Sequence, residues 1–301
     1  MSVTPANSTI YAASSAEHHT LYHLGFCSTN TDFAELFGDV QIICIGGSAK
    51  RFRVYAEEFK KIAGLHREIN DMISTDRFCM YKTGPVLWVN HGMGGPSISI
   101  LLVELFDLIR LSGALDVEFI RIGTSGGISV PPGTIILSTK CYNAEMQPYH
   151  LQTICGKTVQ RESAFNEAMV KELLAEGQAL GIPVQSGATL SADDFYEGQG
   201  RRDGFFADVT ADERASFIES CKNLGVLNIE TEGSVMASYT KRAGFRAAMI
   251  CVTIICRDDS DTVSLSDSEY KDFESRPFLL VASYILKKLD SKSKAEGVIF
   301  E

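Results

Sequence analysis

Several features that would place a protein in a class at once are missing from this 301-residue sequence. Proline occurs only 8 times and charged residues make up 22%, so the composition is that of a globular protein and not of a disordered chain. The eight cysteines include no CxxC pair, and the closest two are Cys251 and Cys256. The six histidines show no ligand spacing either, so we predict neither a disulfide scaffold nor a metal site.

Positive charge is also scarce. The 28 Lys and Arg residues are outnumbered by 38 Asp and Glu residues, which gives a net charge of −10. Nonspecific binding to nucleic acid needs a basic surface that replaces the counterions of phosphate, so we expect no nucleic-acid partner. An anionic ligand would have to be bound by a few arginines concentrated in one site.

Long apolar runs are absent as well. The longest apolar stretch, residues 98–109, is interrupted by Glu104 and Asp107, so we expect no membrane span. The first twenty residues lack the basic start and the apolar core of a secretion signal. We therefore expect a cytoplasmic protein in which residues 1–20 form a flexible arm.

A regular alternation of apolar strands and amphipathic helices fills the rest of the chain. Continuous apolar runs between helices predict strands that are buried on both faces of a sheet. The predicted strands are residues 40–45, 77–82, 86–90, 117–122, 134–139, 184–190, 226–229 and 247–255, and the predicted helices are residues 52–65, 96–111, 164–180, 211–223, 233–242 and 270–289. No linker or repeat divides them, so residues 21–301 are predicted as one α/β domain, a three-layer sandwich around a mixed, barrel-like sheet.

Three glycine-rich segments end predicted strands. The first, residues 46–51, contains Gly47 and Arg51. The second, residues 121–127, contains Arg121, Thr124 and three glycines, and the third is residues 91–96. Glycine lets backbone N–H groups approach an anion closely, and arginine supplies charge, so together these segments indicate an anion site at one edge of the sheet. Taken alone, the Gly47 segment is better explained as a simple turn between strand and helix, and the Arg121 segment could also be a tight glycine turn with a surface arginine.

Residues 123–127 also match the Gly-x-Ser-x-Gly pattern of hydrolases. That pattern needs a helix directly after the serine, here Ser125. Pro131 and Pro132 follow instead and lead into another predicted strand. A serine hydrolase is therefore disfavoured.

Two further segments carry recognition chemistry. Phe195, Gln199 and Arg201 combine an aromatic ring with groups that can bind a planar amide-like ligand, although a polar surface loop explains them too. Glu230 and Glu232 precede a predicted helix, where capping explains one carboxylate and binding of a sugar diol would use the other. Residues 257–261 are predicted as an exposed acidic loop and not as a metal site.

Six motifs follow one another along the chain: Gly-Gly-Ser-x-x-Arg, Met-Tyr-Lys-Thr-Gly-Pro-Val-Leu, His-Gly-Met-Gly-x-Pro-Ser-Ile-Ser-Ile, Arg-Ile-Gly-Thr-Ser-Gly-Gly, Asp-Phe-Tyr-Glu-Gly-Gln-Gly-Arg and Asn-Ile-Glu-x-Glu. In this order, they closely resemble the motifs of the animal-type uridine phosphorylase family, within the nucleoside phosphorylase superfamily. The resemblance runs from about Leu21 to the last predicted helix. It implies an α/β sandwich with a distorted central barrel.

The resemblance also implies three groups of site residues. Phosphate would be bound by Gly47, Arg51, Arg121, Thr124 and, from a neighbouring subunit, Arg77. Ribose would contact Thr231, Glu232 and the neighbour's His23. The base would contact Phe195, Gln199, Arg201 and Arg257. Arg121, Gln199 and Arg201 would be the catalytic residues.

The implied activity is reversible phosphorolysis of uridine to uracil and ribose 1-phosphate, with inorganic phosphate as co-substrate and no cofactor or metal. Shared sites imply a homodimer. Thr231 and Gly233 stand where the family usually has methionine and serine, which keeps two alternatives open: a phosphorylase with shifted specificity, or a weakly active paralogue that binds a nucleoside or uracil. Phe78 follows Arg77 where bacterial members carry a cation-binding glutamate, so that ion site is expected to be absent.

Overall fold

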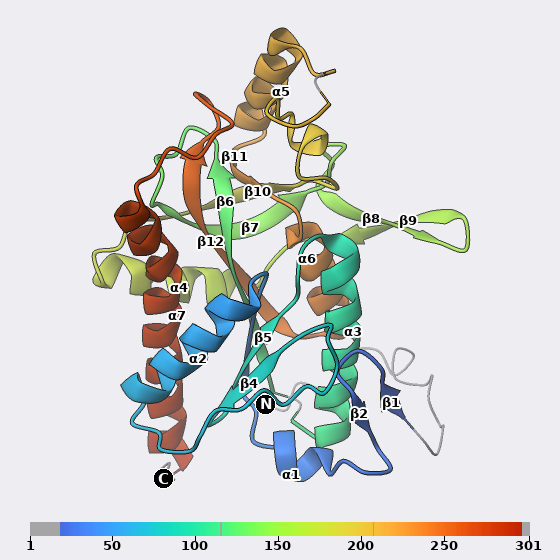
Figure 1. The fold of residues 1–301 in the computed structure, drawn as a ribbon, viewed down its shortest axis with the longest axis vertical. Coiled ribbons are helices and arrows are strands. Elements are labelled where there is room, and N and C mark those ends of the chain that lie inside the picture. Colours follow the sequence, from blue (N-terminus) through green and yellow to red (C-terminus); the bar gives the residue numbers. More distant parts are fainter. Residues whose placement is uncertain (1–18, 115, 207, 297–301) are drawn as a thin grey trace.

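The predicted strands pair into one mixed sheet in the computed structural model, which describes residues 19–114, 116–206 and 208–296 (Figure 1). Its strands are β3 (Ile42–Gly46), β4 (Met80–Thr83), β5 (Val86–Asn90), β6 (Glu118–Gly127), β7 (Ile135–Tyr142), β10 (Val184–Ser191), β11 (Val226–Glu230) and β12 (Arg246–Cys256). They lie in the order β11-β10-β7-β12-β6-β3-β5-β4. Because β11 also pairs with β6, the strands β6, β7, β10, β11 and β12 close into a barrel.

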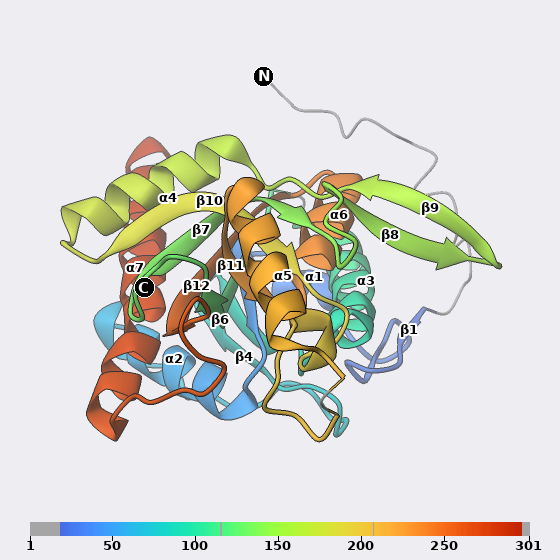
Figure 2. The ribbon, with the colours of Figure 1, turned by 90° about the horizontal axis from the view of Figure 1, so that it is seen from above.

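Helices cover this sheet on two sides and make three layers (Figures 1 and 2). One side carries α2 (Ala49–Ile62), α4 (Glu167–Ala179) and α7 (Asp267–Glu296), and the other carries α1 (Phe33–Phe37), α3 (Gly95–Ser112) and α6 (Gly233–Ala243). The helix α5 (Ala211–Asn223) packs against β11 at the end of the barrel. The predicted three-layer sandwich with a barrel-like sheet is confirmed.

Local chemistry explains where the main helices begin and end. The Ser48 hydroxyl accepts a hydrogen bond from the Arg51 N–H, so α2 begins at Ala49 and not three residues later as predicted. Pro96 lies in the first turn of α3, where its missing N–H costs nothing. That helix ends at Gly113, whose φ of 78° is readily adopted only by glycine.

Several short elements were not predicted. They are β1 (Thr20–Leu21), β2 (Phe26–Cys27), α1, the single 3₁₀ turn η1 (Glu197–Gln199), and the pair β8 (Tyr149–Ile154) and β9 (Lys157–Glu162). The last two form an antiparallel arm that projects from the body (Figures 1 and 2). Neither face of this arm is buried, so its sequence has no apolar alternation to detect.

Two predictions about the chain's ends and edges need adjustment. The strand expected over residues 77–82 begins at Met80, which leaves Arg77 outside the sheet. Of the predicted arm, residues 1–18 lie outside the described residues, and Thr20 already belongs to β1. Among the helices of the described residues, none combines the length and the apolar character needed to cross a membrane.

Candidate active site

The three glycine-rich segments meet at one edge of the sheet. β3 runs parallel to both β5 and β6, so their carboxyl ends lie together. The His91 N–H donates to the Gly46 carbonyl oxygen at 2.7 Å. A β-carbon at Gly47 would lie 2.9 Å from the Gly92 carbonyl oxygen, so a larger residue would force the two segments apart. The predicted convergence of these segments is therefore present in the fold.

Arg121 is the centre of a buried cluster of charges at this edge. Its side chain is only 4% exposed. One terminal nitrogen, Nη2, donates to the Glu232 carboxylate, and Nη1 lies 3.2 Å from Glu230 Oε2. The third nitrogen, Nε, donates to His91 Nε2 at 3.3 Å. The guanidinium is thus fixed on every side by groups from different parts of the chain.

The two carboxylates of this cluster have different tasks. Glu230 accepts hydrogen bonds from the backbone N–H groups of Glu232 and Gly233, each at 2.8 Å, so it caps α6. Glu232 accepts from the Gly94 N–H at 2.6 Å and from the Thr231 hydroxyl at 2.8 Å. Capping therefore belongs to Glu230, and Glu232 is the carboxylate left with acceptor capacity beside Arg121.

Burial and charge set the protonation of the pair in opposite directions. Burial raises the pKa of Glu230. Burial alone would also raise the pKa of Glu232, but the Arg121 guanidinium and two hydrogen-bond donors lower it to about 2. Glu232 is consequently ionised at neutral pH, as an acceptor for sugar hydroxyls must be.

The other two predicted phosphate arginines bind different carboxylates. Arg51, on α2, forms an ion pair with Glu274 of α7, and its buried Nε finds no hydrogen-bond partner among the described residues. The Arg77 side chain is 67% exposed and lies 3.5 Å from its neighbour Asp76. Thr124 lies three residues beyond Arg121 on β6 and is half-buried. Arg121 is therefore bound by two carboxylates and Arg51 by one, whereas Arg77 is exposed beside Asp76.

The predicted base-binding residues form a second group, on the segment around η1. The Arg201 guanidinium carbon lies 4.6 Å from the centroid of the Phe195 ring, which is 52% exposed. Gln199 is buried, and its Oε1 accepts from Arg257 Nη1 at a long 3.4 Å. Arg201 is further bound by Asp203, at 2.9 Å from its Nε.

Arg257 is fully buried and Asp261 is half-buried, so the expected exposed loop at residues 257–261 is wrong for these two residues, whereas Asp259 is exposed. Arg257 Nε donates to Asp261 at 3.0 Å and Arg257 Nη2 to the Gln199 carbonyl oxygen at 2.8 Å. Arg214 binds the same Asp261 carboxylate. A β-carbon at Gly126 would lie 2.8 Å from the Arg257 side chain, so glycine there lets this predicted base-site residue pack against the strand that carries Arg121.

His23 lies apart from both groups, beside α3. Its Nδ1 is 2.6 Å from Glu104 Oε1, and its backbone N–H also donates to that carboxylate. Ser125 lies inside β6, where it is buried and accepts from Asn228 Nδ2 at 2.9 Å. It is not at a strand-to-helix turn, so the prediction against a hydrolase elbow agrees with the fold.

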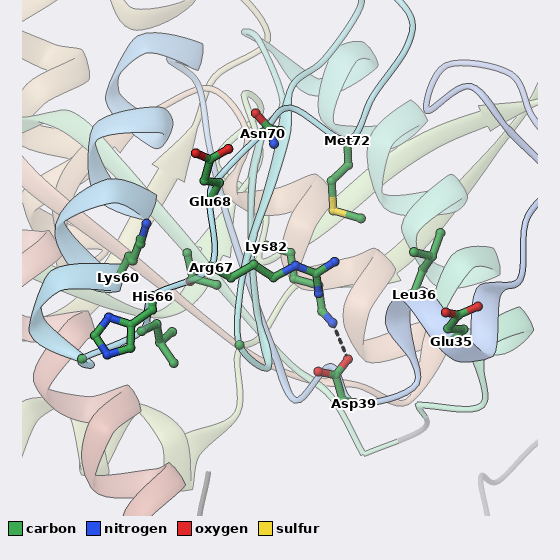
Figure 3. A pocket seen from close by; sticks show the side chains of 14 residues that line it. Glu35, Leu36, Asp39, Lys60, His66, Arg67, Glu68, Asn70, Met72 and Lys82 are labelled. Atoms are coloured by element: carbon green, nitrogen blue, oxygen red, sulfur yellow. Dashed lines mark ion pairs between the residues drawn. The ribbon is translucent and has the colours of Figure 1, made fainter. Parts of the chain in front are cut away.

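A cavity of about 530 Å³ lies elsewhere, near α1, the end of α2 and β4 (Figure 3). Lys60, Arg67 and Met72 line it, together with Lys82 and Asp39, which form an ion pair at 2.6 Å. None of the predicted site residues lines this cavity. This cavity is therefore separate from the predicted site residues.

Reasoning from sequence missed His91, Glu104, Asp261 and Glu274 as partners of site residues. Glu274 is 223 positions from Arg51, and Glu104 is 81 from His23. No local spacing encodes such pairs, because the fold alone brings them together. The only available signal was the presence of His91 in one of the three glycine-rich segments.

Comparison with known proteins agrees with this fold. The model of the phosphorylase superfamily matches residues 41–285, and the chain belongs to that superfamily. Within it, the chain is 46% identical over 268 residues to the uridine and thymidine phosphorylase of Caenorhabditis elegans, which covers 89% of this chain and 90% of the relative.

Two further matches come from Schistosoma mansoni. The chain is 38% identical over 275 residues to inactive uridine phosphorylase B, which covers 90% of this chain and 93% of that protein. The crystal structure of a uridine phosphorylase in complex with thymidine superposes with a TM-score of 0.89 at 36% identity, over 94% of this chain and 98% of that one. The similarity thus extends over nearly the whole domain.

Proposed function

We propose that the protein catalyses the reversible phosphorolysis of uridine to uracil and ribose 1-phosphate. The relatives named uridine phosphorylase, at 38–46% identity, support this assignment. The observation that carries it in this chain is the buried pair of Arg121 and an ionised Glu232 beside the Gly47 backbone. An arginine for an anion and a carboxylate for a diol are the two groups that phosphate and ribose require.

The reaction needs no nucleophilic side chain. Phosphate attacks the anomeric carbon while the glycosidic bond breaks, its electron pair moves to uracil, and uracil then takes up a proton. Arg121, with Arg51, Gly47 and Thr124, would hold the attacking phosphate in line, which makes the step effectively intramolecular. Glu232 would orient the ribose through its hydroxyls.

Charge that develops on the leaving base would be stabilised by Gln199 and Arg201. Fixed donors directed at such charge contribute several kcal/mol to stabilising a transition state. We propose that inorganic phosphate is the only other reactant, with no cofactor or metal ion. Phosphate must also exchange with Glu274 at Arg51, because the two compete for the same guanidinium.

A phosphate-dependence assay tests this function. The purified protein is incubated with uridine with and without phosphate, and uracil is separated by chromatography. We expect uracil only when phosphate is present. No uracil at micromolar protein would instead favour the nucleoside-binding paralogue, for which the inactive relative at 38% identity is a precedent. Calorimetry with uridine would then measure binding without turnover.

Thymidine phosphorolysis is a second candidate. The relative at 46% identity is named for both uridine and thymidine. In this chain the Thr231 hydroxyl binds Glu232, the predicted ribose acceptor, so the environment of the sugar hydroxyls differs from one with methionine at that position. A panel of uridine, deoxyuridine and thymidine, compared by kcat/KM, separates the two candidates.

We further propose that the protein is a cytoplasmic homodimer whose copies complete each other's sites. His23 and Arg77 lie away from the Arg121 cluster, and Arg77 is exposed. Tyr22, next to His23 in the sequence, is also exposed, as are Val103 on α3 and Met93 just before that helix, and Met93 is 85% exposed. Exposed apolar side chains of this size favour contact with a second copy.

Mixing inactive variants tests the shared site. Arg77→Ala and Gln199→Leu chains are combined after partial unfolding and refolding. Random pairing makes half of the dimers mixed, and each mixed dimer regains one intact site, so about a quarter of wild-type activity is expected. No recovery above the separate variants would contradict a shared site. Light scattering gives the oligomeric state, and cell fractionation tests the compartment.

A further inference from the structure

His91 is a fully buried histidine that the proposed reaction leaves without a role. We propose that His91 is a positioning residue, which fixes the orientation of Arg121 by accepting a hydrogen bond from its Nε. This inference rests on the proposed function, because the orientation matters for binding phosphate. His91 touches none of the reactants in this account and acts only through Arg121.

The backbone holds His91 firmly in place. It directly follows β5, and its N–H donates to the Gly46 carbonyl oxygen at 2.7 Å. Its carbonyl oxygen accepts a hydrogen bond from the Ser97 hydroxyl in the first turn of α3. The imidazole is therefore anchored between β3 and α3, and it lies against the Gly47 segment, where a β-carbon would be 4.0 Å from His91 Cε1.

The contact with Arg121 defines the tautomer of the imidazole. A guanidinium has donors only, so the His91 nitrogen that lies 3.3 Å from Arg121 Nε must be an acceptor. This nitrogen is Nε2, and the proton of the neutral ring is then on Nδ1. Backbone groups of His91 and Gly92 favour a proton on the ring, but Nδ1 is buried and finds no hydrogen-bond partner among the described residues.

Burial and the charge of Arg121 keep His91 neutral. Arg121 faces it from β6, and Glu232 faces it from the start of α6. Burial and the charge of Arg121 lower the pKa of His91 to about 3, against the smaller opposing effect of Glu232. A protonated imidazole would lose its acceptor and would place a second positive charge against the guanidinium.

The other partners of Arg121 cannot give the same support during the reaction. Glu232, on Nη2, is the predicted acceptor for ribose hydroxyls, and Glu230, on Nη1, already caps α6. Phosphate would compete for these same terminal nitrogens. His91 binds Nε and has no substrate group to bind, so its contact persists when the terminal nitrogens engage phosphate.

Three variants separate positioning from packing. In His91→Gln, the amide oxygen reaches the position of Nε2 and keeps the acceptor; His91→Asn reaches only the position of Nδ1, and His91→Leu fills the space without an acceptor. We expect kcat on uridine to fall on the order of 100-fold in the Leu and Asn variants, as for a misplaced catalytic group. The uridine KM should change little, and the Gln variant should regain most of kcat.

A second measurement does not depend on turnover. Nitrogen-15 NMR of the imidazole should show an Nδ1–H neutral ring from pH 5 to pH 9, with the Nε2 resonance shifted in an Arg121→Lys variant. Inorganic phosphate binding, measured by calorimetry, should weaken about tenfold in the Leu variant and stay unchanged in the Gln variant, because only the Leu variant removes a hydrogen bond from the guanidinium.

These results keep the two proposals apart. Wild-type protein that does not turn over uridine, yet shows the Nδ1–H ring and the difference in phosphate binding, would refute the proposed function and retain the role of His91. Titration of His91 between pH 5 and pH 8, or wild-type kcat in a folded Leu variant, would overturn the role of His91. Circular dichroism and thermal melting check that each variant is folded.

Discussion

The Arg121 cluster and the segment around η1, the two parts of the proposed site, are built in different ways. Arg121 and Glu232 are buried and bind each other, and their other polar contacts include His91 and Gly94, between β5 and α3, and Glu230 of β11. Phe195 is half exposed, and Arg201 is held mainly by the nearby Asp203. If the proposed function holds, the charges for phosphate and ribose are fixed in place before binding, whereas the surface for the base is open, with Gln199 as its buried anchor.

Replacing Arg121 should have the largest effect of all, on both activity and stability. Arg121→Met leaves Glu230 and Glu232 buried without their cation, which costs about 3–5 kcal/mol of unfolding free energy. Loss of the phosphate contact should lower kcat/KM for uridine by a factor of about 10³ or more. Urea unfolding and steady-state kinetics measure the two effects.

We expect a substitution to lower both the unfolding free energy and kcat/KM strongly in the Arg121 cluster, but not in the segment around η1. Arg53→Met is a suitable control, because Arg53 is exposed on α2 and pairs only with Glu57. It should change neither quantity appreciably. An Arg121→Met protein as stable as wild type would contradict the view that the carboxylates depend on this arginine.

Gln199→Leu should separate activity from stability. Leucine leaves the polar edge of uracil without its partner, so kcat/KM for uridine should fall about 100-fold or more. Within the protein, the substitution removes the long hydrogen bond from Arg257, so the unfolding free energy should fall by no more than about 1 kcal/mol. Gln178→Leu, on the exposed side of α4, is the matched control. An unchanged kcat/KM for uridine in Gln199→Leu would show that Gln199 does not bind the base.

Mild acid should destabilise the buried cluster through His91. Its pKa is about 3 in the folded protein and near 6.5 in the unfolded chain, so between these values the unfolded chain binds a proton that the folded protein does not. Stability is therefore lost as pH falls, by about 2 kcal/mol between pH 7 and pH 5. Glu232, with a pKa of about 2, adds its loss only below about pH 4.5.

The difference between wild type and His91→Gln isolates this contribution from that of the other histidines. Urea unfolding at pH 7, 6 and 5 should show a shallower decline in the variant. Parallel curves for the two proteins would mean that His91 does not stay neutral in the folded state.

Phe195→Leu should give the smallest effect. The ring is half exposed and contacts the Arg201 guanidinium, an interaction of about 0.5–1 kcal/mol at such a site. We expect a roughly two- to fivefold rise in the uridine KM, with kcat nearly unchanged. Tyr196→Leu, whose ring lies farther from Arg201 at 5.8 Å, should change less. A large fall in kcat would mean that the exposed ring does more than line the base site.

Much of the fold was predictable because its strands are buried on both faces. β5 and α5 have the predicted bounds, and most other elements differ by a few residues at their ends. The arm of β8 and β9 could not be predicted, since exposed strands carry no apolar pattern. The closure of β11 onto β6 depends on pairing between distant strands, and no local pattern encodes it.

The site was predictable to a different degree. Glycine-rich segments and arginines at strand ends indicated an anion site, and the motifs together indicated the family. The partners that set the chemistry were not accessible: Glu230 and Glu232 look alike in sequence, yet only the fold shows which of them caps α6. Residues 257–261 look exposed because they are acidic, whereas buried arginines bind Asp261.

Phosphate labelled with oxygen-18 tests the central claim most directly. The protein is incubated with uridine and labelled phosphate, and the products are followed by phosphorus-31 NMR and mass spectrometry. The account predicts ribose 1-phosphate that retains all four labelled oxygens, one of them bonded to the anomeric carbon, in amounts equal to the uracil released. Uracil formed with free ribose, or with no labelled sugar phosphate, would contradict it.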